Sequence, residues 1–295
     1  MIVVVGASGY IGQGFARALA AREVEFLPAS RREFNYYDGD LLRRWLARNK
    51  AQFVINAAGF TGRPNVDACE LERRQCLLAN AALPGIVQSA CESLGIPCGH
   101  VSSGCIFSGT RSGGHGFRET DRPNFTFRQD NCSFYSGCKA LAEETLTGAQ
   151  ACYVWRLRLP FSHIDSPRNL LSKLMRYERL IDVRNSMSRY EEFIEACLDC
   201  WTKRLEFGTY HLTNGGSLTT REIADRLIAA GIVDRPFRYF QSNEEFMASG
   251  VLAPRSNCVL DNSKALDAGL ALASLDDAMN DAIRHWSVGA CDRSL

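Results

Sequence analysis

The chain has 295 residues, of which 46% are hydrophobic and 23% charged. This is ordinary globular usage and excludes disordered and collagen-like proteins. The formal net charge of +1 provides no basic field that would hold nucleic acid or an acidic membrane surface, and no run reaches the roughly 18 apolar residues of a membrane span.

Short apolar runs alternate with helical patterns through the first half of the chain. The patterns predict strands over 1–5, 24–29, 52–57, 97–102 and 152–159, and helices over 11–21, 40–49, 71–94 and 135–147. We expect a break near Leu83-Pro84-Gly85 in the third of these helices. Beyond Pro160 the pattern weakens to helices over 169–179, 190–204 and 219–230, a strand over 209–213 and a closing helix near the end.

Strands that alternate with helices at this spacing indicate right-handed βαβ units. We therefore expect an α/β fold with a Rossmann-type, doubly wound parallel sheet and a smaller interleaved C-terminal lobe. Residues 1–160, with 185–213 returning to them, would form a dinucleotide-binding domain. Residues 161–184 and 214–295 would form mainly a substrate-binding lobe.

The first strand runs into a glycine-rich turn, Gly6-Ala7-Ser8-Gly9-Tyr10-Ile11-Gly12. Between a strand and a helix, such a turn lets a dinucleotide pyrophosphate approach the backbone and the free N–H groups of the helix. The second strand ends at Ser30-Arg31-Arg32 rather than at an acidic residue. Two guanidinium groups suit a 2′-phosphate, so we expect NADP(H), with NAD as the alternative.

The predicted cofactor contacts extend from this turn to the middle of the chain. Small residues at the end of the third strand would let the adenosine half lie against the backbone. The full predicted set is Gly6, Ser8, Gly9, Tyr10, Ile11, Gly12, Ser30, Arg31, Arg32, Ala57, Ala58, Gly59, Asn80, Tyr135, Lys139 and Pro160.

Tyr135 and Lys139 lie four residues apart in a predicted helix, which puts both side chains on one face. A nearby ammonium stabilises tyrosinate and makes the phenol a better acid–base group near neutral pH. The preceding strand ends near Ser103, whose hydroxyl could share a carbonyl oxygen with Tyr135. Together these features resemble the extended short-chain dehydrogenase/reductase superfamily, and the resemblance implies that Ser103, Tyr135 and Lys139 are catalytic.

Longer strings of residues give a closer resemblance, to the bifunctional nucleotide-rhamnose synthases of plants and more broadly to dTDP-4-dehydrorhamnose reductases. The strings are Val54–Gly59, Thr61–Asp67, Cys69-Glu70, Gly104–Phe107, Pro123–Thr126, Phe134–Ser136, Pro167–Asn169, Asn185–Met187 and Ala253–Asn257. The resemblance implies an NADPH-dependent 3,5-epimerase/4-reductase that converts a UDP- or dTDP-linked 4-keto-6-deoxyglucose to the L-rhamnose nucleotide.

That activity requires groups that move protons at C3 and C5, which the C4 ketone acidifies. The resemblance implies Cys105 and Lys173 in this role, and we expect nearby cations to ionise the Cys105 thiol partly. The residues expected to contact substrate are Arg63, Asn65, Ser103, Gly104, Cys105, Asn169, Arg255 and Asn257. His115 and His211 are expected to be structural or exposed.

Two alternatives stay open: a 4-reductase without epimerase activity, and a non-catalytic NADP-binding regulatory subunit. The segment 127–133 is longer than the family pattern suggests and is interpreted as an extended lid beside Tyr135.

The N-terminal residues lack a signal peptide's basic and apolar regions, so a cytoplasmic protein with reduced cysteines is expected. Of the 12 cysteines only Cys197 and Cys200 form a Cys-x-x-Cys pair, and we expect no metal site. The oligomeric state stays open, and a homodimer is suggested by fold-level analogy alone.

Overall fold

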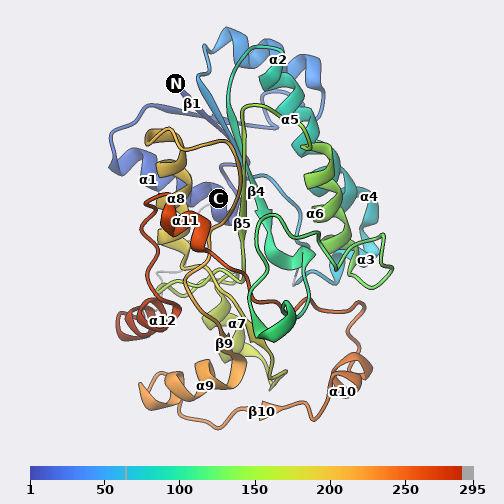
Figure 1. The fold of residues 1–295 in the computed structure, drawn as a ribbon, viewed down its shortest axis with the longest axis vertical. Coiled ribbons are helices and arrows are strands. Elements are labelled where there is room, and N and C mark those ends of the chain that lie inside the picture. The colour runs from blue at the N-terminus through green and yellow to red at the C-terminus, as the bar shows by residue number, and fades with distance from the viewer. Residues whose placement is uncertain (64, 288–295) are drawn as a thin grey trace.

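The computed structural model describes residues 1–63 and 65–287 and contains a parallel sheet of six strands (Figure 1). In spatial order the strands are β2 (Phe26–Ala29), β1 (Ile2–Val5), β3 (Phe53–Asn56), β4 (Cys98–Ser103), β5 (Cys152–Leu157) and β8 (Gly208–His211). The strand order reverses between β1 and β3, where ligands bind in open α/β sheets. The predicted doubly wound α/β fold is confirmed.

Helices cover both faces of the sheet (Figure 1). One face packs against α1 (Tyr10–Ala21), α8 (Tyr190–Thr202) and α11 (Ser263–Asp267), with Phe15, Phe193 and Trp155 in the shared core. The other face lies under α2 (Gly39–Arg48), α5 (Leu83–Glu92) and α6 (Phe134–Thr145). Because both faces are covered, the inner strands are runs of apolar residues rather than alternating ones.

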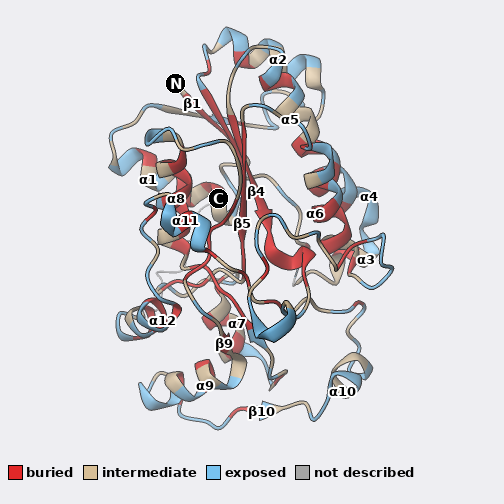
Figure 2. Cartoon of the chain, viewed as in Figure 1, coloured by how far each residue is buried: buried red, intermediate tan, exposed pale blue. Residues whose placement is uncertain are grey.

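The C-terminal lobe has its own apolar core, which includes Phe161, Leu171, Ile223 and Met279. Its elements are α7 (Leu170–Arg176), β6 (Arg179–Leu180), β7 (Arg184–Asn185), β9 (Leu218–Thr219), α9 (Thr220–Ala229), β10 (Arg238–Tyr239), α10 (Asn243–Ala248) and α12 (Leu275–Arg284). Figure 2 shows the central strands and the turn after β4 buried, whereas α10 has no buried residue. The exact division of the chain into two domains stays a prediction.

The predicted helix over 71–94 is the largest difference from expectation. The segment contains α3 (Ala68–Leu71), α4 (Arg73–Leu77), a π-helical turn (Leu78–Ala82) and α5, and the chain bends at Glu72, with φ −108° and ψ 48°. The expected break at Leu83-Pro84-Gly85 is wrong, because Pro84 lies in the first turn of α5. Proline has no N–H to donate to the preceding turn, and the wider π turn accommodates that missing bond.

Within the described residues, no helix is both long and apolar enough to cross a membrane.

Candidate active site

The glycine-rich turn after β1 packs too tightly for larger residues. Gly6 has φ +81°, and a Cβ on it would lie 2.6 Å from the backbone of Ala58; a Cβ on Gly12 would lie 2.0 Å from the carbonyl oxygen of Gly6. Gly9 caps α1 without any side-chain hydrogen bond to the first turn. The turn therefore leaves amides of α1 free for an anion, and these residues fit the pyrophosphate of a dinucleotide.

The end of β2 supplies the basic residues that the sequence predicts. The Ser30 hydroxyl accepts a hydrogen bond from the Arg32 amide at 3.2 Å and shapes the turn. Arg31 and Arg32 are exposed, and neither guanidinium forms an ion pair with any residue that the structure describes. This arrangement fits a 2′-phosphate, which would supply the missing negative charge.

Asn80 lies fully buried in the π-helical turn and shapes the loop after β3. Its amide oxygen accepts the Phe60 N–H at 3.0 Å, and its nitrogen donates to the Phe60 carbonyl at 2.6 Å. A Cβ on Gly59 would lie 3.0 Å from that oxygen and 3.8 Å from Lys139 Nζ. Asn80 therefore holds the Gly59 loop close to Lys139, so its predicted cofactor role would be exerted through the backbone.

Lys139, Tyr135 and Ser103 come together where β4 ends and α6 begins. Lys139 is buried and donates to the Val101 carbonyl at 3.1 Å, and burial lowers the pKa of its ammonium. Burial raises the pKa of the Tyr135 phenol well above its ordinary value, although a hydrogen bond with Ser103 opposes this. This direction favours the protonated phenol, which can donate a proton, whereas the spacing to Lys139 predicts a stabilised tyrosinate.

Cys105 lies in the buried turn Gly104–Ile106 that follows β4. Its amide donates to the Ser103 hydroxyl at 3.2 Å. Burial raises the pKa of the Cys105 thiol despite opposing hydrogen bonds with Ser103 and Ser136 and the charges of Arg158 and Lys139. The expected partial ionisation is therefore wrong, because removing a thiolate from water outweighs the nearby cations. The protonated thiol can donate a proton.

Lys173 lies on α7, in the other lobe. Burial and the charge of Arg168 lower the pKa of the Lys173 ammonium, which favours the neutral amine that can accept a proton. Arg168 itself donates to the Gly62 carbonyl at 2.8 Å and so joins the two lobes. Among the described residues, no hydrogen bond joins Lys173 to Ser103, Cys105 or Tyr135.

Two of the predicted substrate contacts, Arg255 and Asn65, already have side-chain partners in the protein. Arg255 Nη2 pairs with Asp67 Oδ2 at 2.6 Å, and Asn65 Oδ1 accepts the Asp67 amide at 2.8 Å. Asn257 accepts the Gly109 amide through its backbone carbonyl, which leaves its side chain available. Arg63 is exposed.

The polar atoms of Asn169 are used within its own loop. It is fully buried, its oxygen caps α7 by accepting the Leu171 amide at 3.0 Å, and its nitrogen donates to the carbonyls of Ser162 and Ile164. All of these bonds stay within residues 162–171, so Asn169 has a structural role as a helix cap, and its contact with substrate stays a prediction. Asn169 is the last residue of the Pro167-Arg168-Asn169 motif, and the motif does not distinguish the two roles.

The structure adds polar residues that the sequence analysis did not single out. Arg158, buried at the end of β5, donates to Asn185 Oδ1 at 2.6 Å and to the Ser256 carbonyl. Arg156 pairs with Glu143 on α6 at 2.6 Å, and Ser102 also donates to Glu143. Arginines inside an otherwise apolar strand were the available signal, since buried charges require partners.

His211 lies against Arg156, with 2.8 Å between the nitrogens, and its pKa falls to about 3 because of burial and the Arg156 charge. It is neutral and structural, as expected, and His115 is exposed.

The segment predicted as an extended lid packs on α6. The Phe127 ring lies so close to Gly137 that a Cβ there would approach it to 2.3 Å, and Arg128 pairs with Glu144. The segment therefore covers the helix that carries Tyr135 and Lys139.

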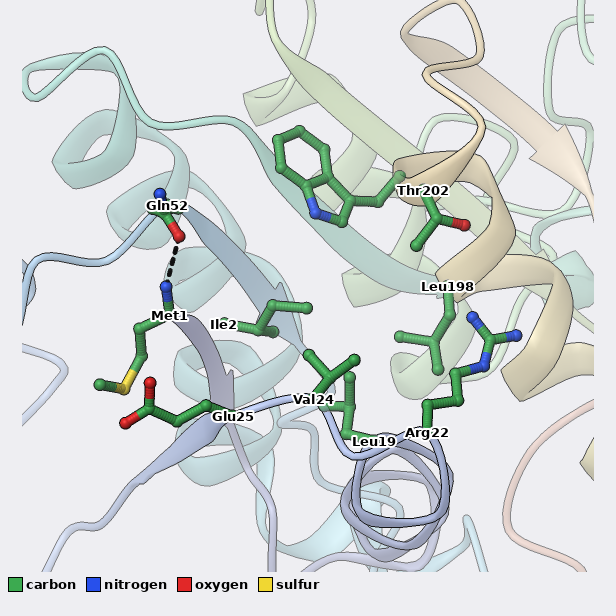
Figure 3. Close-up of a pocket in the computed structure, with 10 residues that line it drawn as sticks. Met1, Ile2, Leu19, Arg22, Val24, Glu25, Gln52, Leu198 and Thr202 are labelled. Carbon is green, nitrogen blue, oxygen red and sulfur yellow. Dashed lines mark hydrogen bonds between the residues drawn. The ribbon is translucent and has the colours of Figure 1, made fainter.

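A hollow of about 300 Å³ lies near the amino-terminal ends of β1, β2 and β3, whereas Ser103 and Cys105 lie at the carboxyl end of β4 (Figure 3). Met1, Leu19, Val24 and Leu198 line it, and its one arginine, Arg22, is engaged by Glu195 and Asp199. It contains none of the predicted site residues. Among the described residues no group of histidines, cysteines and carboxylates could hold a metal ion.

Comparisons with known proteins match nearly the whole chain. Residues 1–287 match the family described as RmlD substrate binding domain. The bifunctional dTDP-4-dehydrorhamnose 3,5-epimerase/dTDP-4-dehydrorhamnose reductase of Arabidopsis thaliana is 33% identical over 267 residues, which cover 89% of this chain and 85% of that protein.

Two solved structures share the fold. A UDP-rhamnose synthase from Acanthamoeba polyphaga mimivirus superposes with a TM-score of 0.88 at 22% identity, covering 96% of this chain and 98% of that one. A dTDP-4-dehydrorhamnose reductase from Bacillus anthracis in complex with NADP superposes with a TM-score of 0.79 at 18% identity, covering 97% of each chain.

Proposed function

The chain belongs to the RmlD substrate binding domain family, and we propose that it is an NADPH-dependent 3,5-epimerase/4-reductase. Its substrate would be a UDP- or dTDP-linked 4-keto-6-deoxyglucose and its product the corresponding nucleotide-L-rhamnose. The observation that carries this proposal is the convergence of Ser103, Cys105 and Tyr135 at the end of β4. A ketone reductase requires an acid at the carbonyl oxygen, and an epimerase requires a further acid–base group.

Bound NADPH supplies the hydride that reduces C4. Lys139, buried beside Gly59 and Asn80, would hold the nicotinamide ribose. The Tyr135 phenol would give its proton to the C4 oxygen, because its raised pKa keeps it protonated until the alkoxide develops. Ser103, whose hydroxyl lies near enough to Tyr135 to oppose the rise of its pKa, would bind the same oxygen and orient it.

Epimerisation would precede reduction and use the same oxygen site. Deprotonation at C3 or C5 places negative charge on the C4 oxygen, where Ser103 and Tyr135 would stabilise the enolate. The lowered pKa of Lys173 suits it to accept the proton, and the protonated thiol of Cys105 suits it to return one. Inversion requires the two groups to act on opposite faces of the carbon.

The substrate side has a strongly cationic character that suits a nucleoside diphosphate. Arg168, Lys173 and Arg255 belong to the C-terminal part of the chain, and Arg168 and Arg255 both contact the loop that contains Gly62 and Asp67. Asp67 is the one carboxylate that pairs with these three cations among the described residues. A diphosphate would supply the remaining negative charge.

A second candidate is a 4-reductase that leaves epimerisation to another enzyme. The likeness of fold to a dTDP-4-dehydrorhamnose reductase over 97% of each chain favours it. The two candidates differ in one measurable property, which is exchange of the C3 and C5 protons with solvent.

The deciding experiment incubates the protein with NADPH and either nucleotide 4-keto-6-deoxyglucose in deuterium oxide, with no other enzyme. We expect a rhamnose nucleotide with deuterium at both C3 and C5. A reduced product without deuterium at these carbons would leave only the 4-reductase. Absence of any NADPH oxidation with both substrates would overturn both candidates.

Replacing Cys105 tests the epimerase half by itself. Cys105→Ala should lower exchange by about 10²–10⁴-fold, the usual contribution of an acid–base group, and should leave NADPH binding intact. Cys197→Ala, which also removes a fully buried thiol but lies on α8, is the matched control. Exchange by Cys105→Ala at the rate of the control would show that Cys105 serves packing alone.

A further inference from the structure

Two carboxylates on the short segment Asp67–Leu71 reach different parts of the site. Asp67 immediately precedes α3, and Glu70 lies three residues later within it. Asp67 contacts the C-terminal segment that contains Arg255, and Glu70 contacts the start of α6. The segment itself lies in neither part, so its two side chains join the substrate side to the catalytic helix.

Asp67 bonds to the backbone of Leu252 and to the side chain of Arg255. Its Oδ2 pairs with Arg255 Nη2 at 2.6 Å, and its Oδ1 accepts the Leu252 amide at 3.3 Å. Arg255 also donates to the Ala253 carbonyl at 3.4 Å, within its own loop. A guanidinium has five N–H donors, so Arg255 keeps donors for a ligand while Asp67 sets its orientation.

Glu70 satisfies an amide that α6 cannot satisfy by itself. Its Oε1 accepts the Phe134 N–H at 2.6 Å, and Phe134 is the first residue of α6. The N-cap side chain of Ser133 is used by the Ser136 amide. A carboxylate at a helix N-terminus is also favoured by the helix dipole. Since Tyr135 is the next residue, the Glu70 contact fixes the backbone from which the phenol projects.

Stability alone accounts poorly for this arrangement. The Asp67 and Arg255 side chains are 19% and 23% exposed, and partly exposed ion pairs contribute little to folding. Their effect is instead on orientation, because each carboxylate fixes a group that the reaction uses. Asp67 and Arg255 are also 188 residues apart in the sequence, so their pairing does not serve the local folding of either segment.

We propose that Asp67 and Glu70 are positioning residues of the reaction. Asp67 orients Arg255 for the nucleotide diphosphate, and Glu70 orients the start of α6 for proton transfer by Tyr135. This inference rests on the proposed function for the identity of the ligand and of the acid. It assigns the Asp67-x-x-Glu70 spacing a task in both binding and chemistry.

The test compares KM and kcat for the nucleotide sugar in variants of the two positions. Asp67→Asn, which keeps an amide oxygen and loses the charge, should raise KM about tenfold with little change in kcat, as expected for one charge-assisted hydrogen bond. Glu70→Ala should lower kcat about tenfold with little change in KM, and Glu70→Gln, whose oxygen can still accept the Phe134 amide, should restore most of it.

Glu72→Gln is the matched control, because Glu72 is exposed directly after the segment Asp67–Leu71 and its side chain forms no hydrogen bond or ion pair with a described residue. If Asp67→Asn and Glu70→Ala both stay within about twofold of this control in KM and kcat, the proposal is overturned. Equal effects of each variant on KM and kcat, without rescue by Glu70→Gln, would also overturn it and indicate a purely structural role.

Binding of UDP and of dTDP, measured by calorimetry without turnover, separates this proposal from the proposed function. An inactive wild type that binds either nucleotide, with binding weakened about tenfold by Asp67→Asn but not by Glu70→Ala, would contradict the reaction and retain the role of Asp67. An active wild type whose nucleotide binding is unchanged by Asp67→Asn would contradict the role of Asp67 and retain the reaction.

Discussion

The proposed catalytic side of the site and its proposed substrate side are built differently. Ser103, Cys105, Tyr135 and Lys139 come from two neighbouring elements, β4 with its turn and α6, and their contacts are buried. Arg168, Lys173 and Arg255 come from the C-terminal part of the chain, and two of them, Arg168 and Arg255, contact the loop of Gly62 and Asp67. The first set is therefore held by burial against neighbouring elements, and the second by contacts between segments that are far apart in the sequence.

The largest effect is expected at Tyr135, on the catalytic side. Tyr135→Phe removes the proton donor and should lower kcat for reduction by about 10²–10⁴-fold, whereas NADPH binding should persist through the Lys139 and glycine-turn contacts. Stopped-flow NADPH oxidation and fluorescence titration measure the two quantities. Tyr239→Phe, in β10 of the other lobe, is the control. Full activity of Tyr135→Phe would contradict the role of Tyr135 as the proton donor.

The sequence predicts the catalytic side because local patterns determine it. Apolar runs bounded by glycine define the strands, and the Tyr135–Lys139 spacing needs only a helix. The protonation of Cys105 does not follow from its local sequence, because the apolar cluster that buries it also includes Cys258 and Leu260, which are distant in sequence.

The substrate side shows the same limit more strongly. A local motif shows that Asn169 and Arg255 are polar residues but not which atoms they contact. Asn169 caps α7, and Arg255 pairs with a residue 188 positions away. The π-helical turn before Pro84 was missed for a related reason, because a proline signals a break without specifying how the chain accommodates it.

The second effect, on stability, concerns the buried ion pair that joins Glu143 of α6 to Arg156 of β5. Glu143 and Arg156 are 12% and 5% exposed and pair at 2.6 Å, and Ser102 donates to the same carboxylate. Glu143→Gln leaves Arg156 without a counter-charge in the interior and should lower the free energy of unfolding by about 3 kcal/mol. Urea denaturation measures this.

Glu144→Gln is the control for the support of α6. Glu144 is the next residue of α6, and its pair with Arg128 is exposed, so its loss should change stability little. Equal destabilisation by both variants would mean that the buried Glu143–Arg156 pair contributes no more to stability than the exposed Glu144–Arg128 pair.

The smallest effect is a shift in pH dependence on the substrate side. Lys173 must be neutral to accept a proton, so solvent exchange at C3 and C5 should rise with pH and level off above the pKa of Lys173. Burial and the Arg168 charge lower that pKa, so the plateau should begin below the range of an ordinary lysine. Arg168→Met removes a positive charge, raises the pKa of Lys173 and should move the rise to higher pH.

Arg168→Lys keeps the charge at this position and should leave the rise near its wild-type place. Because both variants lose the guanidinium contact to the Gly62 carbonyl, a difference between them isolates charge from lobe packing. Coincident pH profiles for the two variants would mean that Arg168 acts through the lobe contact, and the electrostatic tuning of Lys173 would then come from burial alone.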